Sequence, residues 1–137
     1  MTERDIPDTA FSVSIAAARI VMAAHLEALN AQDPDALAAT MHFPHYRLSG
    51  GVMQVWQRPT TYLADFHTRA SSDWHRTEWE SVDVLMASPV KVHLDVPFTR
   101  FRADDSILAN HRSLWVISEI ANVWAAQLRS RFAPLRV

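Results

Sequence analysis

Two histidines, His42 and His45, lie in the segment HFPHYRLSGGVMQVW and are candidates for metal binding or proton transfer. Histidine is the commonest metal ligand in proteins, and it titrates near neutral pH. Ligands four residues apart share one face of a helix, but these two are three apart, and Pro44 between them prevents a helix. No carboxylate is near them in the sequence. We therefore predict that backbone groups satisfy both rings at a helix-to-strand corner, and His45 stays a candidate base in a pocket.

A complete metal site would need ligands from distant parts of the chain. His93 and His111, on later predicted strands, could join His42 and His45 only through a coincidence of register. The chain has no cysteine, which excludes disulfides, thiolate catalysis and zinc sites built on sulfur. We predict no metal and no cofactor, and a metal-dependent enzyme is the third of three hypotheses.

A carboxylate and a guanidinium, those of Asp83 and Arg100, form the second candidate pair. Asp83 stands between Val82 and Val84, so the face of the strand that it occupies decides its role. Inside an apolar cone, a carboxyl group can serve as a general acid or base. On the outer face, the same two residues would form an ordinary cross-strand ion pair. Both roles are left open.

Five tryptophans are a high count for 137 residues, and four of them fall in predicted strands. Aromatic side chains bring large buried areas to cores and interfaces, and one or two can line a cavity for a flat ligand. Arg129 and Arg131, near the end of the chain, are interpreted as solvated strand ends. The residues predicted to line a ligand pocket are Tyr46, Trp56, Tyr62, Trp79, Arg100 and Trp115.

The elements that must position these side chains begin with helices. Apolar residues recur every three or four positions over the first thirty residues, with abundant alanine between them. This spacing predicts a helix over Thr9–Ala31 with Asp8 as its N-cap. Asp33 followed by Pro34 is a second start signal, and it predicts a short helix that ends near Met41.

The only two glycines, Gly50 and Gly51, separate two apolar-rich runs. Glycine tolerates the positive φ angles of a tight turn, so this pattern predicts a strand, a turn and a strand. Pro59 then starts a third, short helix. The histidine-rich segment is therefore interpreted mainly as a hairpin.

The residue period changes from 3.6 to 2 in the second half of the chain. Apolar and polar residues alternate from Val90 to Thr99, which is the cleanest strand signal. We predict a strand over Trp74–Met86 before it and a last hairpin of Ser113–Glu119 and Val123–Ser130 after it. Helices followed by strands predict an α+β fold, in which three N-terminal helices pack on one face of a curved antiparallel sheet.

The last two strands are apolar on both faces, at Leu114–Ile117 and at Val123–Ala126. A half-exposed antiparallel strand should instead alternate between apolar and polar residues. The helical layer covers one face, and the chain has no element left to cover the other. We therefore expect a homodimer that forms through the outer face of the sheet.

Composition limits the classes of partner. Thirteen basic and fifteen acidic residues give a net charge of −2, which supplies no electrostatic reason to expect nucleic acid or an anionic membrane. No uninterrupted apolar run approaches the roughly 18 residues of a membrane span. The N-terminal residues lack the pattern of a signal peptide. One domain is expected from the length, with a core over about residues 9–134 and a cytoplasmic location.

Three segments together resemble the nuclear transport factor 2-like superfamily: PHYRLSGGVMQVW, TEWESVDVLMASPVKVHLDVPFTRFRADD and SLWVISEIANVWAAQLRSRF. That superfamily includes ketosteroid isomerases, polyketide cyclases and scytalone dehydratase. The resemblance covers nearly the whole chain and is greatest to bacterial members without a settled activity. It implies a cystatin-like α+β barrel, whose cone-shaped, curved antiparallel sheet is wrapped by the three N-terminal helices. It also implies a homodimer with a conical pocket between the sheet and the helices, which hosts catalysis in some members and only binding in others.

The resemblance also implies an aspartate base on the early strand pair in members of the isomerase type. Here residues 36–64 contain no aspartate or glutamate, and His45 and Arg47 stand nearest to that motif. Arginine cannot act as a base at neutral pH. The carboxylic acid that such enzymes use as an oxyanion donor would fall near Phe98 or Thr99, and neither can replace it. The absence of both carboxyl groups argues against ketosteroid-type proton transfer.

Two further hypotheses for function therefore stay open. In the first, an internal pocket binds a small, mostly apolar molecule, with lyase- or isomerase-type acid–base chemistry through His45 or Asp83 as an added role. In the second, the chain is a non-catalytic homodimeric interaction or scaffold module. A cavity that contains a desolvated titratable group favours the first, and a filled, wholly apolar cone favours the second.

Overall fold

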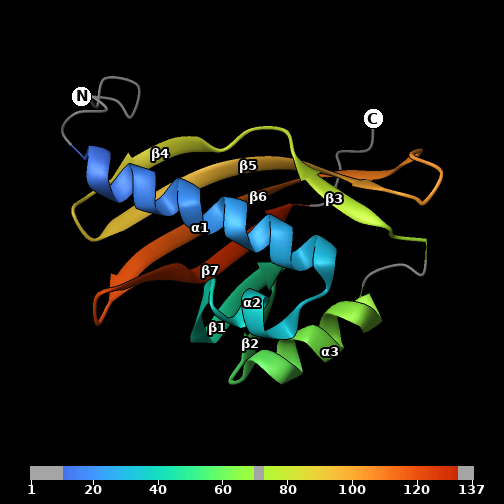
Figure 1. The fold of residues 1–137 in the computed structure, drawn as a ribbon, viewed down its shortest axis with the longest axis horizontal. Coiled ribbons are helices and arrows are strands. Elements are labelled where there is room, and N and C mark those ends of the chain that lie inside the picture. Colours follow the sequence, from blue (N-terminus) through green and yellow to red (C-terminus); the bar gives the residue numbers. More distant parts are fainter. Residues whose placement is uncertain (1–10, 70–72, 133–137) are drawn as a thin grey trace.

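The computed structural model describes residues 11–69 and 73–132 (Figure 1). Two helices open the described chain, a third follows the first hairpin, and five further strands complete it, so the predicted α+β class is confirmed. The predicted N-cap Asp8 lies outside the described residues. The elements are α1 Ser12–Ala31, α2 Pro34–Ala38, β1 Met41–Ser49, β2 Val52–Trp56, α3 Pro59–Arg69, β3 Arg76–Trp79, β4 Asp83–Ala87, β5 Lys91–Phe101, β6 Ile107–Ile120 and β7 Val123–Phe132.

The seven strands form one curved, unclosed sheet, and α1 lies across one of its faces (Figure 1). The strand order is β2-β1-β7-β6-β5-β3, with β4 also paired to β5. The sheet is mixed, not wholly antiparallel as predicted, because β1 runs parallel to β7. No tight turn joins these two strands, so the hairpin geometry that would force an antiparallel pair does not apply to them.

The single strand predicted over Trp74–Met86 is two strands, β3 and β4, which pair with opposite halves of β5. The break lies opposite Pro97, whose carbonyl oxygen accepts a hydrogen bond from the Glu80 amide at 2.8 Å. Proline has no N–H to donate, so the ladder is interrupted at this position. Two short strands therefore replace the long one.

Local signals at helix and strand ends are confirmed by the structure. The Asp33 carboxylate accepts a hydrogen bond from the Ala36 amide at 3.1 Å, with Pro34 at the first helical position of α2. That helix ends at Ala38, short of the predicted end, because β1 already begins at Met41. A side-chain cap and a proline therefore start α2 where the sequence predicts.

The first hairpin turns at the two glycines as predicted. Gly50 and Gly51 have φ angles of 57° and 80°, and Ser49 pairs with Val52 across the turn. Two successive positive φ angles are typical of a type I′ turn, whose twist matches that of the flanking strands. His42 and His45 thus lie on a strand, β1, ahead of this turn.

The core lies between α1 and the inner face of the sheet. The predicted alternation in β5 is confirmed, because Val92, Leu94 and Val96 are all fully buried. They pack in one cluster with Ala18 and Met22 of α1. Burial of each such aliphatic side chain contributes about 1.5–3 kcal/mol to folding, so this cluster supplies much of the stability.

The α1 helix is long and apolar enough to span a membrane by length and composition alone. The sequence reading expected no such segment, because Arg19 and Glu27 interrupt the apolar run, although the average over the window stays high. The core helix of a protein that is not inserted in a membrane satisfies the same criterion. The buried residues of α1, among them Ala18 and Met22, pack with the residues of the sheet.

Candidate functional site

Four arginines share the inner face of the sheet with the apolar core. Arg47 of β1 pairs with Arg129 of β7, which in turn pairs with Trp115 of β6. Arg131 of β7 lies in the next row, and Arg100 projects from β5. Residues that are directly opposite on neighbouring strands point to the same side of a sheet. The register therefore gathers these arginines on the concave side.

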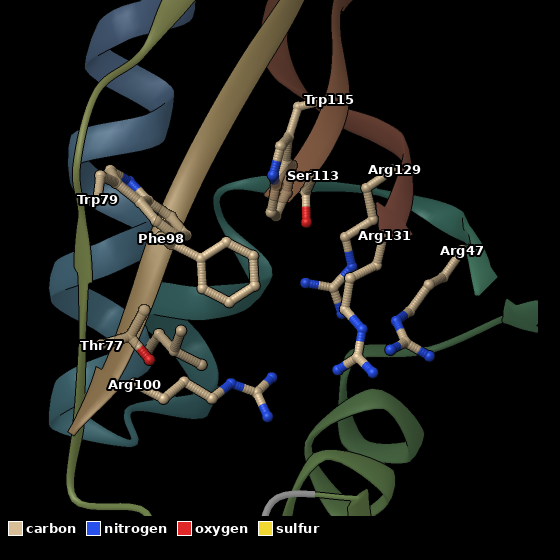
Figure 2. A pocket seen from close by; sticks show the side chains of 10 residues that line it. Arg47, Thr77, Trp79, Phe98, Arg100, Ser113, Trp115, Arg129 and Arg131 are labelled. Carbon is tan, nitrogen blue, oxygen red and sulfur yellow. The ribbon is translucent and has the colours of Figure 1, made fainter. Parts of the chain in front are cut away.

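A small cavity is enclosed where these side chains meet. Figure 2 shows the guanidinium groups of Arg47, Arg100, Arg129 and Arg131 directed toward one space. Its enclosed volume is about 20 Å³, which is room for about one water molecule. The side chains that line it are Leu29, Arg47, Thr77, Trp79, Phe98, Arg100, Ser113, Trp115, Arg129 and Arg131.

An open hollow of about 310 Å³ adjoins the cavity. It is lined by Arg47, Ser49, Val52, Gln54 and Arg131, so it shares two arginines with the enclosed space. The Arg47 guanidinium donates a hydrogen bond from Nη1 to Oε1 of Gln54 at 2.9 Å. The arginines therefore stand between an interior space and solvent.

The described residues that line the cavity carry no negative charge. The Arg129 guanidinium lies 5.4 Å from the ring centre of Tyr62 and 5.2 Å from that of Trp115, which are cation–π distances. Burial and the neighbouring Arg129 charge lower the pKa of Arg131 from its usual value. Arginine nevertheless stays protonated in proteins, so the cavity is strongly electropositive.

Three aromatic rings form the inner wall of the cavity. Trp79 meets Phe98 edge-to-face at a ring-centre distance of 5.7 Å and Trp115 at 6.1 Å. The Trp79 indole donates a hydrogen bond to the carbonyl oxygen of Met22 at 3.0 Å, which ties the wall to α1. The indole N–H of Trp115 is buried and has no hydrogen-bond acceptor among the described residues. The wall is thus fixed to α1 through Trp79, and Trp115 contributes one buried donor to it.

His25 of α1 lies fully buried behind this wall and was missed by the sequence reading. Its ring centre is 4.9 Å from that of Trp115, and its Nδ1–H donates to the hydroxyl of Thr40 at 2.9 Å. Burial, with smaller contributions from Arg129 and His45, holds the pKa of His25 well below its usual value. The three-four spacing of Met22, His25 and Leu29 could have placed it on the core face.

His111 of β6 lies on the same inner face, with its ring stacked on Phe98 at 5.2 Å. Burial and the charges of Arg131, Arg100 and Arg47 lower the pKa of His111 to about 4, against an opposing backbone hydrogen bond with Phe132. The ring is therefore neutral at pH 7. Burial is the largest cause of this low pKa, and the positive field of the arginine cluster adds to it.

His42 and His45 each have one ring nitrogen hydrogen-bonded to a backbone carbonyl group, as predicted from the sequence. His42 donates from Nε2 to Ser118 at 2.9 Å, and His45 donates from Nδ1 to Ala126 at 3.2 Å. His45 is fully buried and does not line the cavity. Within the described ranges, no three histidine, aspartate or glutamate side chains gather at one point.

Asp83 and Arg100 do not form the expected pair. Asp83 is exposed on β4, opposite Asp95, and accepts a hydrogen bond from the Ser81 hydroxyl at 2.8 Å. Arg100 lies at the other end of β5, opposite Thr77 of β3. The break between β3 and β4 separates the two residues. An exposed carboxylate outside the cavity cannot act there as a general acid or base.

The six predicted pocket residues lie in three different places. Trp79, Arg100 and Trp115 line the cavity. Trp56 and Tyr62 are fully buried beside it, with their ring centres 5.1 Å apart. Tyr46 faces the opposite side of the sheet, where it lines a separate hollow with Leu48, Met53 and Leu128.

The arginines are the feature that the sequence reading missed. Arg129 and Arg131 were interpreted as solvated strand ends, but both line the interior cavity. Their two-residue spacing shows that they share a face of β7. Only the pairing of β7 between β1 and β6 shows that this face is the inner one.

Comparisons with known proteins support the fold. No protein-family model matches the sequence, and no curated protein matches it significantly. A protein of unknown function from Mycobacterium tuberculosis is similar in structure, with a TM-score of 0.77 and 14% identity, over 96% of this chain and 78% of that one. An NTF-2 like protein of unknown function from Shewanella oneidensis MR-1 has a TM-score of 0.67 and 13% identity, over 87% of this chain and 98% of that one.

A third solved structure is an uncharacterised protein with a cystatin-like fold from Caulobacter vibrioides. It has a TM-score of 0.68 and 16% identity, and the match covers 88% of this chain and 89% of that one. At these identities the likeness concerns the fold alone. The fold predicted from the sequence resemblance is confirmed.

Proposed function

We propose that this chain, which has the nuclear transport factor 2-like fold, binds a small organic molecule in the cavity between its sheet and α1. The observation that carries the proposal is the aromatic wall of Trp79, Phe98 and Trp115, with its unused indole donor. Aromatic walls with a few polar groups are typical of small-molecule sites. The expected ligand contains a flat apolar ring.

The ligand must displace side chains, because the enclosed space is only about 20 Å³. The aromatic wall is held by edge-to-face contacts, whereas arginine side chains have many rotamers. The adjoining hollow of about 310 Å³ can receive Arg131 when it swings away from the wall. Ligand entry through this hollow is therefore the simplest route.

We assign no catalysis to His45 or Asp83. His45 is enclosed by Trp56 and Tyr62, at ring-centre distances of 6.3 and 5.8 Å, and Asp83 is exposed. The proposal is a binding function, without the acid–base chemistry that the sequence left open. A filled, wholly apolar cone would favour the non-catalytic interaction module instead. The cavity is lined in part by four arginines, which a pocket without a ligand would not explain.

Native mass spectrometry of untagged protein tests the proposal, followed by tryptophan fluorescence with the molecule that co-purifies. A mass increase of a few hundred daltons, lost in a Trp115→Phe variant, supports it. Trp124→Phe is the matched control, because Trp124 packs against the core without lining the cavity. Bare protein from several growth conditions would contradict the proposal.

A second candidate function, a homodimeric interaction module, is favoured by the outer face of the sheet. Val55, Tyr46, Leu128 and Val116 lie opposite one another across four neighbouring strands, so they form one apolar row. On the same face, Met53 of β2 and Phe132 of β7 are each about 60% exposed. Stable dimers bury about 800 Å² per partner, which is the area that this face would have to bury.

Sedimentation velocity at micromolar concentration tests the dimer. We expect a dimer that a Leu128→Lys variant converts to a monomer, because a charge in the apolar row would be desolvated. Ile20→Lys is the control, since Ile20 is exposed on α1 and is not part of the sheet. A monomeric parent protein would exclude this candidate.

A further inference from the structure

Three residues that line the cavity each have a buried donor without an acceptor in the described part of the chain. The Nε–H groups of Arg129 and Arg131 and the indole N–H of Trp115 have no hydrogen-bond acceptor among the described residues. Guanidinium and indole groups donate and never accept. Buried polar groups are normally hydrogen-bonded, so these three donors call for a ligand that supplies oxygen acceptors.

The charges on the two sides of the cavity have the same sign. Arg129 and Arg131 come from β7, and Arg47 lies beside Arg129 on β1. Arg100 approaches from β5, on the other side of the enclosed space (Figure 2). The lowered pKa values of Arg131 and His111 arise from burial together with this accumulation of positive charge.

The planar fork of arginine matches the geometry of one class of ligand. Guanidinium groups bind carboxylate and phosphate oxygens through two parallel N–H···O hydrogen bonds. A group with two or three oxygens between β5 and β7 would accept hydrogen bonds from both sides of the cavity. It would also bring negative charge to a cavity whose described lining residues carry none.

We propose that the ligand of this cavity is an aromatic oxyanion, an aryl carboxylate or aryl phosphate, whose charged group is bound by Arg47, Arg100, Arg129 and Arg131. The ring lies against Trp79, Phe98 and Trp115, and the oxygens face the arginines. This inference rests on the proposed function, because it uses the same cavity, and it adds the chemical class of the ligand.

Isothermal titration calorimetry with three matched probes tests the inference. Benzoate, phenyl phosphate and the neutral isostere benzamide carry the same ring. We expect benzoate or phenyl phosphate to bind about tenfold or more tightly than benzamide. Tighter binding of phenyl phosphate than of benzoate would identify a phosphate ester as the preferred source of the oxyanion, and the reverse order would identify a carboxylate.

Failure of this inference can be separated from failure of the proposed function. Benzamide that binds as tightly as benzoate would overturn the oxyanion assignment and leave the small-molecule site intact. Absence of binding by all three probes would overturn both. The titrations are made at low salt and repeated at 0.5 M sodium chloride, because a partly buried ion pair is screened less than an exposed one.

Variants locate the binding site within the protein. We expect Arg131→Gln to weaken binding of the preferred oxyanion about tenfold or more and to leave benzamide unchanged. Arg131→Lys keeps the charge but loses the planar fork, so an intermediate affinity is expected. Arg19→Gln is the matched control, because Arg19 is exposed on α1 and does not line the cavity.

Folding of each variant is checked by circular dichroism before titration. If Arg131→Gln does not fold, Arg100→Gln on the opposite side of the cavity gives an independent test. Equal oxyanion affinity in the parent, in the folded cavity variant and in Arg19→Gln would overturn the assignment of the arginines.

Discussion

The two ends of the inner face of the sheet have opposite chemistry on the same strands. Along β5, the buried Val92, Leu94 and Val96 are followed by Phe98 and then by Arg100. Along β7, Ala126 is followed by two arginines that line the cavity. Along β5 the alternation of inward and outward residues runs from the aliphatic end to Arg100, whereas in β7 a register shift between Ala126 and Leu128 separates the two ends. Only the type of the inward residue changes, from aliphatic to cationic.

The aromatic wall marks the boundary between the two ends. Trp115 belongs to the core cluster with Leu94, and it also lines the cavity with Arg129. At the aliphatic end, burial without charge stabilises the fold. At the arginine end, like charges in a half-buried place oppose folding. The comparison indicates that the aliphatic end stabilises the fold, whereas the arginine end lowers its stability, as the proposed binding of an oxyanion would require.

The largest expected effect comes from the aliphatic end. Leu94→Ala should lower the free energy of unfolding by about 2–5 kcal/mol, because Leu94 is fully buried and its removal leaves a cavity. Urea unfolding measures the loss, and the folded variant should keep its oxyanion affinity. Val90→Ala is the exposed control, with an expected change within about 0.5 kcal/mol. A loss of unfolding free energy below about 1 kcal/mol in Leu94→Ala would contradict the claim that the aliphatic end supplies the stability.

The next effect is a dependence of stability on pH at the arginine end. The pKa of His111 is about 4 in the folded chain, below its unfolded value near 6.5, so the unfolded chain binds more protons between these values. Stability is complete above pH 6.5 and is lost as the pH falls toward 4. The fully buried His25, whose pKa is also lowered, acts in the same direction.

The shift of the His111 pKa corresponds to about 3 kcal/mol if unscreened, and solvent at this half-exposed ring reduces it to about 1–2 kcal/mol. Urea unfolding of a His111→Gln variant should therefore show a weaker dependence on pH between 6.5 and 4. The exposed His75→Gln variant serves as the control. Identical slopes for the parent and for His111→Gln would refute the prediction.

A smaller effect is expected outside both ends. Asp33→Ala removes the N-cap of α2 and should cost about 1 kcal/mol, without a change in oxyanion affinity. Thermal unfolding and calorimetry check the two quantities. Asp35→Ala, in the first turn of the same helix, should cost less, because Asp35 contributes no cap. A drop in affinity with Asp33→Ala would mean that binding follows overall stability.

Local features of the structure could be predicted from the sequence, whereas the site could not. The alternation from Val92 to Phe98, the turn at Gly50-Gly51 and the cap at Asp33 depend on neighbouring residues only, and all three are confirmed. The fold was predicted from the order of these elements and from the resemblance of three segments. These predictions need only short-range sequence patterns and the order of the helices and strands along the chain.

The site depends on contacts between residues that are far apart in the chain. Arg47 and Arg129 become neighbours only through the parallel pairing of β1 and β7, which no local pattern indicates. Asp83 leaves the site because the ladder breaks opposite Pro97. The same arginine pair, Arg129 and Arg131, would be solvated on an edge strand, so residue type alone favoured the wrong interpretation.

The most direct test of these two roles of the inner face uses an Arg131→Met variant. Its thermal unfolding is measured with and without phenyl phosphate or benzoate. Methionine keeps the apolar stem and removes the charge. We expect the unliganded variant to be about 0.5–2 kcal/mol more stable than the parent and to lose the stabilisation by the oxyanion. A less stable variant that is still stabilised by the oxyanion as strongly as the parent would contradict a binding role for the arginine end.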